Sequence, residues 1–524
     1  MKYQPLKQPW NHQARALAYL HGRKWFALQM AMRTGKTKVA LDDFGQLETD
    51  GMVDDLLVIA PAGVYRTWID AVEDHVDPSL KKRLKIYLWR SGKKNASKEQ
   101  LLRKYFMQAR NGPRLLLINI EALSAVDEAF CLAEDFLKQR RVYFVIDEST
   151  TIKNESIRTE RALKLGPLAE YRRILTGLIS PRSPLDVFFQ FQFLEPGSLG
   201  HRTYTSFKAR YAIEKKMCTL PTGVLQGRLA SRVGTSVTIN GVMTQVTTLD
   251  RNSVMNELDR RGIWYQKFNT IVGYKNEDEL RDRIAPHSFR VKLEDCYDLP
   301  PKLYSVRDIE MTPEQKRIYK SLKEKATAEL TEMEHVTALS VVARMIRLHQ
   351  VLCGHTRDEM DKLHEIPEKR TAALIDLLRE VEGKAVIWAS YDYNVRFISA
   401  ALEEEFGEGC VARFWGGNEG TREEEEKIFQ TDEACRFMIG TPAAGGRGRR
   451  WSAADTVIYF SNTNNLEHRS QSEERTQGIG KTESVVYIDL IVPDTVDARI
   501  IQALRDKIDM AATISGDTWK EWLI

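Results

Sequence analysis

One short motif has the residue types and spacing to bind the phosphates of a nucleotide. An apolar stretch, WFALQM, ends at Met30, and Thr34-Gly35-Lys36-Thr37 follows it and leads into a helix-compatible segment. A glycine lets backbone N–H groups approach phosphate oxygens, a helix N-terminus is positive, and the lysine adds a cation. A threonine hydroxyl can bind Mg²⁺. The motif therefore predicts a nucleotide site made by Thr34, Gly35, Lys36 and Thr37, with Thr37 as a Mg²⁺ ligand.

The motif is incomplete at one position. The full pattern G-x-x-x-x-G-K-[ST] has glycine where this sequence has Met30. Read alone, the tetrapeptide also fits a Gly-Lys turn on a surface helix. Residues farther along the chain have to decide between these two interpretations.

Two adjacent carboxylates provide that second signal. The strand-like run YFVI is followed directly by Asp147 and Glu148. In phosphate-loop ATPases a carboxylate at the tip of a buried strand holds Mg²⁺, and a neighbouring residue can orient the attacking water. Acidic residues also end many exposed strands, but here they come after a Gly-Lys-Thr motif. We therefore predict catalytic roles for Lys36, Asp147 and Glu148, with Asp147 as a second Mg²⁺ ligand.

Composition describes an ordinary globular chain. Its 524 residues are 43% hydrophobic and 29% charged, and this length predicts about two to four domains. The net charge of +4, from 77 basic and 73 acidic residues, is too small to indicate a nucleic-acid partner by itself. The six cysteines lack C-x-x-C spacing, which argues against a zinc site. Without a membrane-length apolar run or a signal-peptide core, the chain is expected to be intracellular and to bind no membrane.

Strand-like runs alternate with helical segments in the first third of the chain. The run LLVIA precedes Pro61 and the run LLLI precedes Asn119. This alternation predicts a parallel sheet covered by helices on both faces. Ligands gather at the carboxyl ends of the strands in such sheets, which is where Gly35, Pro61, Asn119 and Asp147 all fall.

A glutamine lies upstream of the first apolar stretch. Pro9-Trp10-Asn11-His12-Gln13 opens a helical segment. The Gln13 amide offers both a donor and an acceptor to an adenine edge, and Trp10 could stack on the base. A polar helix start is an equally good interpretation of the pentapeptide, and we predict that Gln13 binds the nucleotide.

Eight segments in order carry a family resemblance: Gln13, TGKT, VIAPAGVYRTW, LLINIEAL, VIDEST, IKN, RRILTG and PLDVFFQFQFLEP. Together they resemble the first motor lobe of superfamily 2 helicases, specifically the Snf-type DNA-translocating ATPases. In VIDEST, Ser149-Thr150 replaces the Ala-His of the family's DEAH-like box, which changes the residue that usually couples the lobes. The resemblance implies nucleic-acid contacts at Pro61 and Asn119.

A second lobe is expected in the back half of the chain. Strand-like runs recur at residues 385–389, 437–440, 456–460 and 485–490. Their alternation with helices predicts a second RecA-like lobe. The loop GGRGRRW resembles motif V of the family, and guanidinium groups in such a loop can bind phosphates of ATP or DNA. The nucleic-acid contacts predicted there are Arg447, Arg449 and Arg450, although a solvated arginine loop is the alternative.

The segment QSEERTQGIGKT resembles motif VI, whose family form is Q-A-x-D-R-x-H-R-I-G-Q-T. Gln471 and Arg475 match, whereas Gly478 stands at the second arginine. In the family both arginines reach the γ-phosphate, and an arginine finger raises the rate by about 10³ to 10⁵. The resemblance assigns Gln471 to ATP binding and Arg475 to catalysis. Gly478 leaves three options open: compensation by Arg475, Arg447 or Lys481, slow hydrolysis, or an altered residue.

The predicted fold class is α/β, with two RecA-like parallel-sheet lobes and a mostly helical insertion. The expected divisions are lobe 1 (1–196), the insertion (197–283), a return segment of lobe 1 (284–310), a helical protrusion and linker (311–365), lobe 2 (366–495) and a C-terminal helical segment (496–524).

The resemblance implies two lobes that clamp ATP and Mg²⁺ while both grip DNA, with duplex DNA favoured. The leading functional hypothesis is a DNA-dependent ATPase that translocates on, or remodels, duplex or branched DNA. Two alternatives stay open. One is a strand-separating helicase, and the other is an ATP-gated DNA clamp whose hydrolysis is weak because of Gly478.

Overall fold

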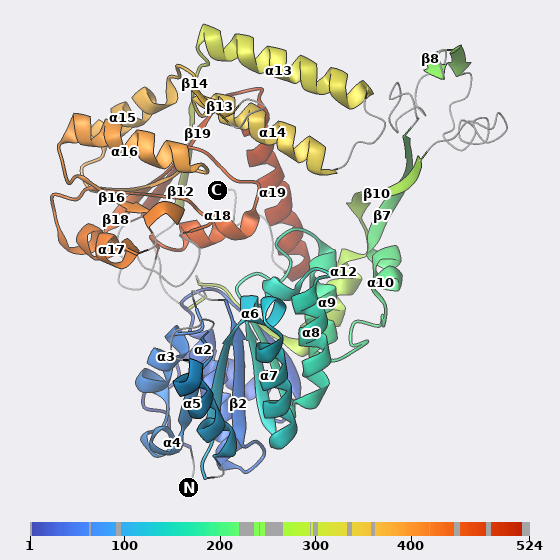
Figure 1. Ribbon diagram of the computed structural model, residues 1–524, viewed down its shortest axis with the longest axis vertical. Helices are drawn as coiled ribbons and strands as arrows, with labels where there is room; N and C mark the ends of the chain where they lie inside the picture. The colour runs from blue at the N-terminus through green and yellow to red at the C-terminus, as the bar shows by residue number, and fades with distance from the viewer. Residues whose placement is uncertain are drawn as a thin grey trace.

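The chain forms two parallel-sheet lobes, one above the other, with a narrow ribbon that projects to one side (Figure 1). The computed structural model describes residues 3–61, 64–90, 96–109, 111–219, 235–239, 242–246, 266–293, 295–296, 302–332, 338–357, 362–418, 420–444, 451–477 and 484–515. Among these residues, no helix combines the length and apolar character needed to cross a membrane.

Lobe 1 is built on a seven-stranded sheet whose paired neighbours are all parallel, in the order β11-β1-β6-β5-β2-β4-β3. Its strands are β1 (Trp25–Met30), β2 (Asp55–Ala60), β3 (Lys85–Leu88), β4 (Arg114–Asn119), β5 (Val142–Asp147), β6 (Tyr171–Thr176) and β11 (Ser288–Val291). Strands β2 and β5 are buried along their whole length, as expected for a parallel sheet covered on both faces.

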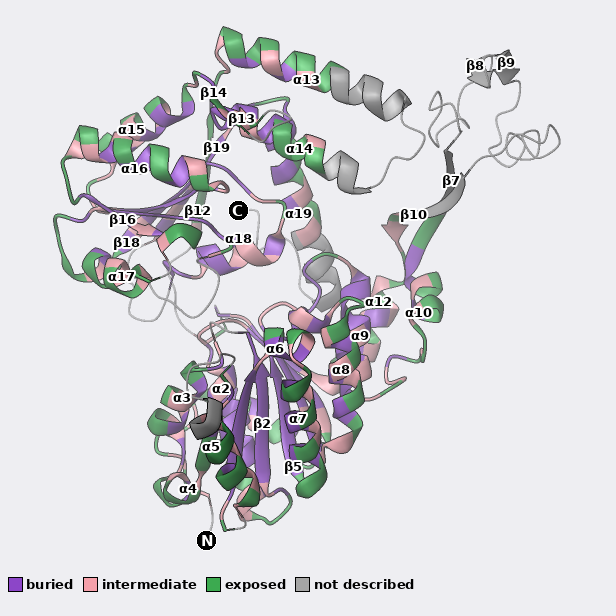
Figure 2. Cartoon of the chain, viewed as in Figure 1, coloured by how far each residue is buried: buried purple, intermediate pink, exposed green. Residues whose placement is uncertain are grey.

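Helices cover both faces of this sheet, and their buried sides face the strands (Figure 2). They are α1 (Asn11–Leu20), α2 (Lys36–Thr49), α3 (Thr67–His75), α4 (Pro78–Arg83), α5 (Ala96–Gln108), α6 (Ile120–Ala125), α7 (Asp127–Gln139), α8 (Ile157–Leu165) and α9 (Val187–Leu194). Alternate residues of β2 enter opposite cores. Leu57 packs in the core with Phe136 of α7, and Leu56 packs in the core with Trp68 of α3. Strand periodicity therefore makes two cores from one sheet.

A buried ion pair fixes helix α2 against the strands. Asp43 of α2 accepts hydrogen bonds from Arg173 Nε of β6 at 3.1 Å and from the Tyr143 hydroxyl of β5 at 2.6 Å. Arg173 is fully buried. Burial opposes the charge of Arg173, but the Asp43 carboxylate raises its pKa above the ordinary value. Since α2 begins at Lys36, this pair also fixes the position of the phosphate-loop lysine.

Lobe 2 is built on a six-stranded sheet, again with parallel neighbours, in the order β12-β19-β18-β15-β17-β16. Its strands are β12 (Lys302–Asp308), β15 (Lys384–Trp388), β16 (Val411–Phe414), β17 (Phe437–Gly440), β18 (Ala454–Tyr459) and β19 (Val485–Ile491). Its helices are α15 (Arg370–Glu380), α16 (Asp392–Phe406), α17 (Arg422–Thr431), α18 (Leu466–Glu473) and α19 (Val496–Ser515). The prediction of two RecA-like parallel-sheet lobes is therefore confirmed.

The segment that returns to lobe 1 ends earlier than predicted. Strand β12 pairs with β19 in the lobe 2 sheet, so residues 302–308 do not belong to the return segment of lobe 1, which was predicted to extend to residue 310. Strand β11, earlier in the same segment, does return to lobe 1 and pairs with β1. Helices α13 (Pro313–Glu332) and α14 (Ala338–Leu352) and the hairpin β13 (His355–Arg357) and β14 (Leu363–Glu365) follow.

The prediction of a mostly helical insertion is wrong for the residues that the structure describes. Helices α10 (Tyr204–Tyr211) and α12 (Glu277–Ile284) flank an antiparallel ribbon of β7 (Ala212–Thr219) and β10 (Gln266–Tyr274), and β8 (Thr235–Ile239) pairs with β9 (Val242–Val246). The ribbon carries threonine, isoleucine and valine, residue types that favour strands. Helix α12 at its base packs against α19 of lobe 2.

We expect Asp43→Ala to destabilise lobe 1 by about 3–5 kcal/mol, because the buried Arg173 guanidinium would lose its carboxylate. Hydrogen exchange of the β5 and β6 amides measures this effect and should be faster in the variant. Glu160→Ala removes an exposed carboxylate, paired with Lys164 on the surface of α8, and should leave exchange unchanged. Unchanged protection in Asp43→Ala would contradict the assigned role.

Candidate nucleotide-binding site

The phosphate loop joins β1 to α2, and its backbone depends on two left-handed residues. Arg33 has φ +67° and Gly35 has φ +85°. A Cβ at Gly35 would lie 2.2 Å from Gln13 Nε2, so both the backbone angle and the close approach require glycine here. The loop therefore presents Lys36 at the first position of α2.

Gln13 and His12 hold this loop from helix α1. The Gln13 amide donates to the Thr34 carbonyl at 3.1 Å and accepts from the Trp10 N–H at 2.9 Å, and His12 Nε2 lies 2.8 Å from the same Thr34 carbonyl. The structure thus brings the predicted residue Gln13 into direct contact with the phosphate loop. In this arrangement its amide contacts the loop backbone, and its predicted contact with a base stays a prediction.

The predicted catalytic residues of lobe 1 lie together and are buried. Lys36 Nζ is 3.5 Å from Glu148 Oε1, and Asp147 at the end of β5 accepts a hydrogen bond from Trp68 Nε1 at 2.9 Å. Glu148 has φ +51°, a strained angle for a residue other than glycine. The strained turn directs two successive carboxylates to the same end of the sheet.

Burial and neighbouring charges change the pKa values of this cluster. Burial raises the pKa of Asp147 to about 6, and the Glu148 charge adds to the rise, whereas Lys36 and the Trp68 hydrogen bond oppose it. For Lys36, burial disfavours the charged form, but the Glu148 and Asp147 carboxylates raise its pKa above the ordinary value. Lys36 therefore remains a cation, and Asp147 lacks a full counter-charge, which a divalent cation could supply.

Lobe 2 meets this edge through helix α18 and the residues just after it. Glu467 of α18 accepts hydrogen bonds from the Thr150 hydroxyl at 3.0 Å and from Lys153 Nζ at 3.1 Å. Arg33 donates to the backbone carbonyls of Gln477 and, at 3.0 Å, Arg475. Three side chains of lobe 1 thus bind lobe 2 directly.

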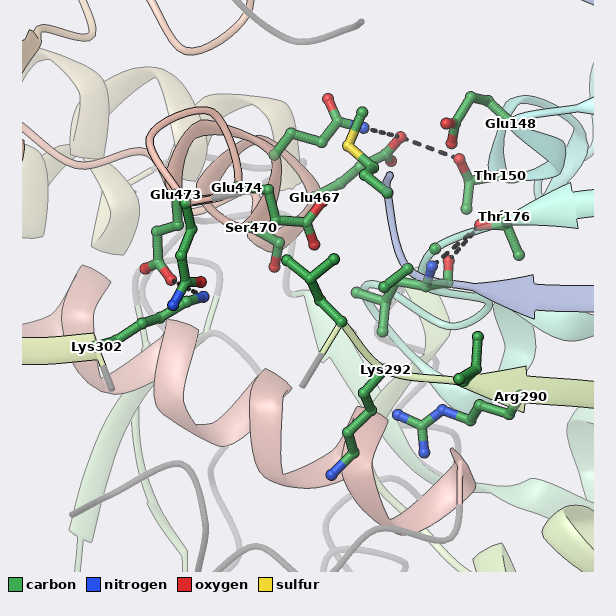
Figure 3. Close-up of a pocket in the computed structure, with 18 residues that line it drawn as sticks. Glu148, Thr150, Thr176, Arg290, Lys292, Lys302, Glu467, Ser470, Glu473 and Glu474 are labelled. Atoms are coloured by element: carbon green, nitrogen blue, oxygen red, sulfur yellow. Dashed lines mark hydrogen bonds and ion pairs between the residues drawn. The ribbon is translucent and has the colours of Figure 1, made fainter. Parts of the chain in front are cut away.

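A cavity lies between the lobes at these contacts (Figure 3). Its lobe 1 wall includes Glu148, Thr150 and Arg290, and its lobe 2 wall includes Gln471 and Glu474. Burial raises the pKa of Glu474, although Lys302, Lys36 and Arg33 oppose the rise. The two lobes therefore share one cavity, which Glu148 lines from lobe 1 and residues of α18 line from lobe 2.

The Arg475 side chain packs within lobe 2, an arrangement that its match to motif VI did not predict. Its guanidinium packs over the Trp451 ring at 4.8 Å, and Trp451 stacks on Trp388 at 5.0 Å. Arg475 is 3% exposed. Its backbone lies at the lobe interface, since its carbonyl accepts from Arg33, but its side chain packs within lobe 2. Its predicted contact with the γ-phosphate stays a prediction.

The remaining predicted residues fall into two groups. Pro61 directly follows β2 and Asn119 is the last residue of β4, at the same end of the sheet as Asp147. Arg447, Arg449, Arg450, Gly478 and Lys481 lie outside the described residues. Sequence reasoning missed Trp68 as the donor to Asp147 and Glu467 as the acceptor for lobe 1. Trp68 stood within VIAPAGVYRTW, but no sequence signal indicated which residue its indole contacts.

The family model described as "SNF2-related domain" matches residues 25–357, which is more than half of the chain. The chain belongs to the SNF2-related family. The predicted resemblance to Snf-type proteins is thereby confirmed.

Curated relatives of this SNF2-related chain include much longer proteins. Protein CHROMATIN REMODELING 4 from Arabidopsis thaliana is 22% identical over 46% of this chain and 12% of its own length. An uncharacterized ATP-dependent helicase from Mycoplasma pneumoniae is 20% identical over 72% of this chain and 31% of its own length. TATA-binding protein-associated factor mot1 from Aspergillus fumigatus is 24% identical over 71% of this chain and 20% of its own length. The chain thus spans less than a third of the length of these relatives.

A solved structure is also similar. The SWI2/SNF2 ATPase core of Sulfolobus solfataricus in complex with dsDNA is 19% identical, with a TM-score of 0.39, over 100% of this chain and 97% of that one.

The cluster of Lys36, Asp147 and Glu148 in this SNF2-related chain fits a nucleoside triphosphate with Mg²⁺. The described residues hold no group of three or more His, Cys, Asp or Glu side chains that could bind a metal by themselves. Mg²⁺ usually takes one or two carboxylates and completes its shell with substrate phosphates and water. Asp147, whose pKa is raised by burial, and Thr37 in the phosphate loop suit such a shared site.

We expect Glu467→Ala to shift the equilibrium toward separated lobes by about tenfold, because charge-assisted hydrogen bonds stabilise by about 1.5–3 kcal/mol. The Lys153 and Glu467 side chains are 12% and 14% exposed, so water screens them little. Small-angle scattering of the protein without nucleotide measures lobe separation. Adding Lys153→Ala to Glu467→Ala should change little more, and equal scattering curves for wild type and Glu467→Ala would contradict this role.

Proposed function

We propose that this chain is an ATP-driven motor that translocates on DNA or remodels DNA-bound structures, with duplex DNA favoured. The observation that carries the proposal is the buried cluster of Lys36, Asp147 and Glu148, because Glu148 of this cluster lines a cavity whose opposite wall belongs to a second parallel-sheet lobe. A cluster in one lobe alone could bind a nucleotide. Its place at the contact between two lobes allows nucleotide binding to change how the lobes meet.

ATP is the substrate in this proposal. Lys36 leaves Glu148 and binds the β- and γ-phosphates, and Glu148 then orients a water molecule. The water oxygen bonds to the γ-phosphorus, the bond from that phosphorus to the bridging oxygen breaks, and ADP leaves with the electron pair. The water proton passes to Glu148 or to the released phosphate. Thr37 and Asp147 would hold Mg²⁺, which neutralises phosphate charge when bound.

Motion follows from the contacts across the cleft. Thr150 and Lys153 follow Glu148 within five residues and donate hydrogen bonds to Glu467 of lobe 2. A movement of Glu148 during the reaction would therefore displace the side chains that bind α18. If both lobes hold one DNA backbone through contacts that do not depend on sequence, each cycle shifts that grip along the track. Pro61 and Asn119 in lobe 1, and Arg447, Arg449 and Arg450 in lobe 2, are the proposed contacts with DNA.

The test is an ATPase comparison without nucleic acid and with duplex DNA, single-stranded DNA or RNA, together with a forked-duplex unwinding assay. Duplex-stimulated hydrolysis without unwinding supports the proposal. Unwinding instead supports a strand-separating helicase, and ATP binding without turnover supports an ATP-gated clamp. We expect Lys36→Ala to abolish turnover in every condition, because the loop would lose the ammonium group that binds the β- and γ-phosphates, while circular dichroism remains that of the wild type. Full activity in Lys36→Ala would remove the site assignment.

A pH profile tests the role of Asp147. In the proposal Asp147 must be ionised to hold Mg²⁺, so activity is present above its pKa and is lost as pH falls through it. The Trp68 hydrogen bond lowers that pKa. We therefore expect Trp68→Phe to move the acid limb of kcat/KM for MgATP to higher pH by about one pH unit.

Trp89→Phe is the matched control, because Trp89 is a buried tryptophan of the same lobe outside the Asp147 contacts. Its acid limb should coincide with that of the wild type. If the acid limb of Trp68→Phe also stays in place, Asp147 does not govern it.

A further inference from the structure

Arg33 holds a conformation that its side chain disfavours. It lies in the phosphate loop with φ +67°, in the left-handed region that costs about 1 kcal/mol or more for a residue with a Cβ. Strain of this kind persists where the surrounding structure imposes it, and it gathers at ligand sites. A glycine would adopt this angle without strain, so the side chain of Arg33 needs its own explanation.

The guanidinium of Arg33 crosses the cleft. It donates to the carbonyls of Gln477 and Arg475 in lobe 2, while its backbone stands three residues before Lys36. These acceptors are neutral peptide groups. A guanidinium binds phosphate more strongly than it binds a carbonyl, because two parallel charge-assisted hydrogen bonds can form.

Arg33 and Lys36 also act on the same carboxylate. Both cations oppose the rise in the pKa of Glu474, which lines the cavity. Glu148 and Glu474 line this cavity from opposite lobes, and Lys36 Nζ is 3.5 Å from Glu148 Oε1. Because Arg33 lies three residues before Lys36 in the same loop, an anion bound by this loop would be near both cations.

We propose that Arg33 is a phosphate-contacting catalytic residue of this motor, a role that rests on the ATPase function proposed above. When ATP is bound, the Arg33 guanidinium leaves the two lobe 2 carbonyls and binds the γ-phosphate. As the bond to the bridging oxygen breaks, it stabilises the charge that develops on the phosphate oxygens. The phosphate loop itself thus supplies a cation, and its transfer releases lobe 2 from lobe 1.

The experiment uses Arg33→Gly, which removes the guanidinium but permits the left-handed backbone, and Arg33→Lys, which keeps a charge without the planar pair of donors. Steady-state ATPase kinetics give kcat and KM. Titration with fluorescent ATP and ADP analogues gives the ratio of the two affinities. Thermal melting verifies folding, which Arg33→Gly should preserve because it removes strain.

For Arg33→Gly we expect kcat to fall by about 10³-fold and affinity for the ATP analogue to fall about tenfold more than affinity for the ADP analogue. Arg33→Lys should recover only part of the lost kcat and only part of the lost preference for the ATP analogue. Arg141→Ala, which removes an exposed arginine before β5 at the opposite end of the sheet, should match the wild type in kcat and in the affinity ratio.

Two results separate the possible failures. An unchanged kcat, or equal losses of affinity for the ATP and ADP analogues, would overturn the role of Arg33 and leave it as a contact between lobes. A wild-type protein that hydrolyses no ATP under any condition would instead overturn the proposed motor. The affinity ratio would still decide whether Arg33 contacts the γ-phosphate.

Discussion

The buried contact of Lys36 with Glu148 and Asp147 is the constraint on which the rest of lobe 1 depends. Removing charges from water costs several kcal/mol per ion unless partners are held close. The strand order β1-β6-β5 sets the distance between the phosphate loop and the carboxylates, and Asp43 binds Arg173 of the strand between them. Trp68 reaches Asp147 from α3. The partners come from α2, α3, β6 and the end of β5, so the cluster forms only when these elements have come together.

The contacts of Lys36 and the contacts between the lobes depend on the same local charges. In this structure Lys36 binds a carboxylate, Arg33 binds backbone carbonyls, and Glu467 binds Thr150 and Lys153. A triphosphate adds several negative charges to the cavity, so it competes with Glu148 for Lys36 and weakens any contact that relies on a neutral acceptor. The partners released in this competition belong to different lobes. In the proposed motor, nucleotide binding would therefore change the lobe interface without any large rearrangement inside either lobe.

Much of this fold follows from sequence, and the parts that do not have physical reasons. Both sheets were predicted because buried parallel strands are continuous apolar runs, as in YFVI before Asp147. Strand β12 was assigned to the wrong lobe because only its pairing with β19 determines its sheet, and pairing partners leave no local signal. The ribbon was missed because short polar strands lack the periodicity of a buried face. Arg33 and Glu467 were missed because their partners are 442 and 317 positions away.

The residues that replace Ala-His in the VIDEST motif include Thr150, whose hydroxyl contacts lobe 2. Thr150 stands where the family has histidine, and its shorter side chain shares the Glu467 carboxylate with Lys153 three residues later. Gln471, the matched motif VI glutamine, donates to the same Glu467 oxygen at 3.4 Å. One carboxylate thus gathers a hydroxyl, an ammonium and an amide from both sides of the cleft. Gln471 lies on α18 with Glu467 and moves with it, whereas a rotation of α18 that breaks the Thr150 contact also loosens the Lys153 contact, because both share the Glu467 carboxylate.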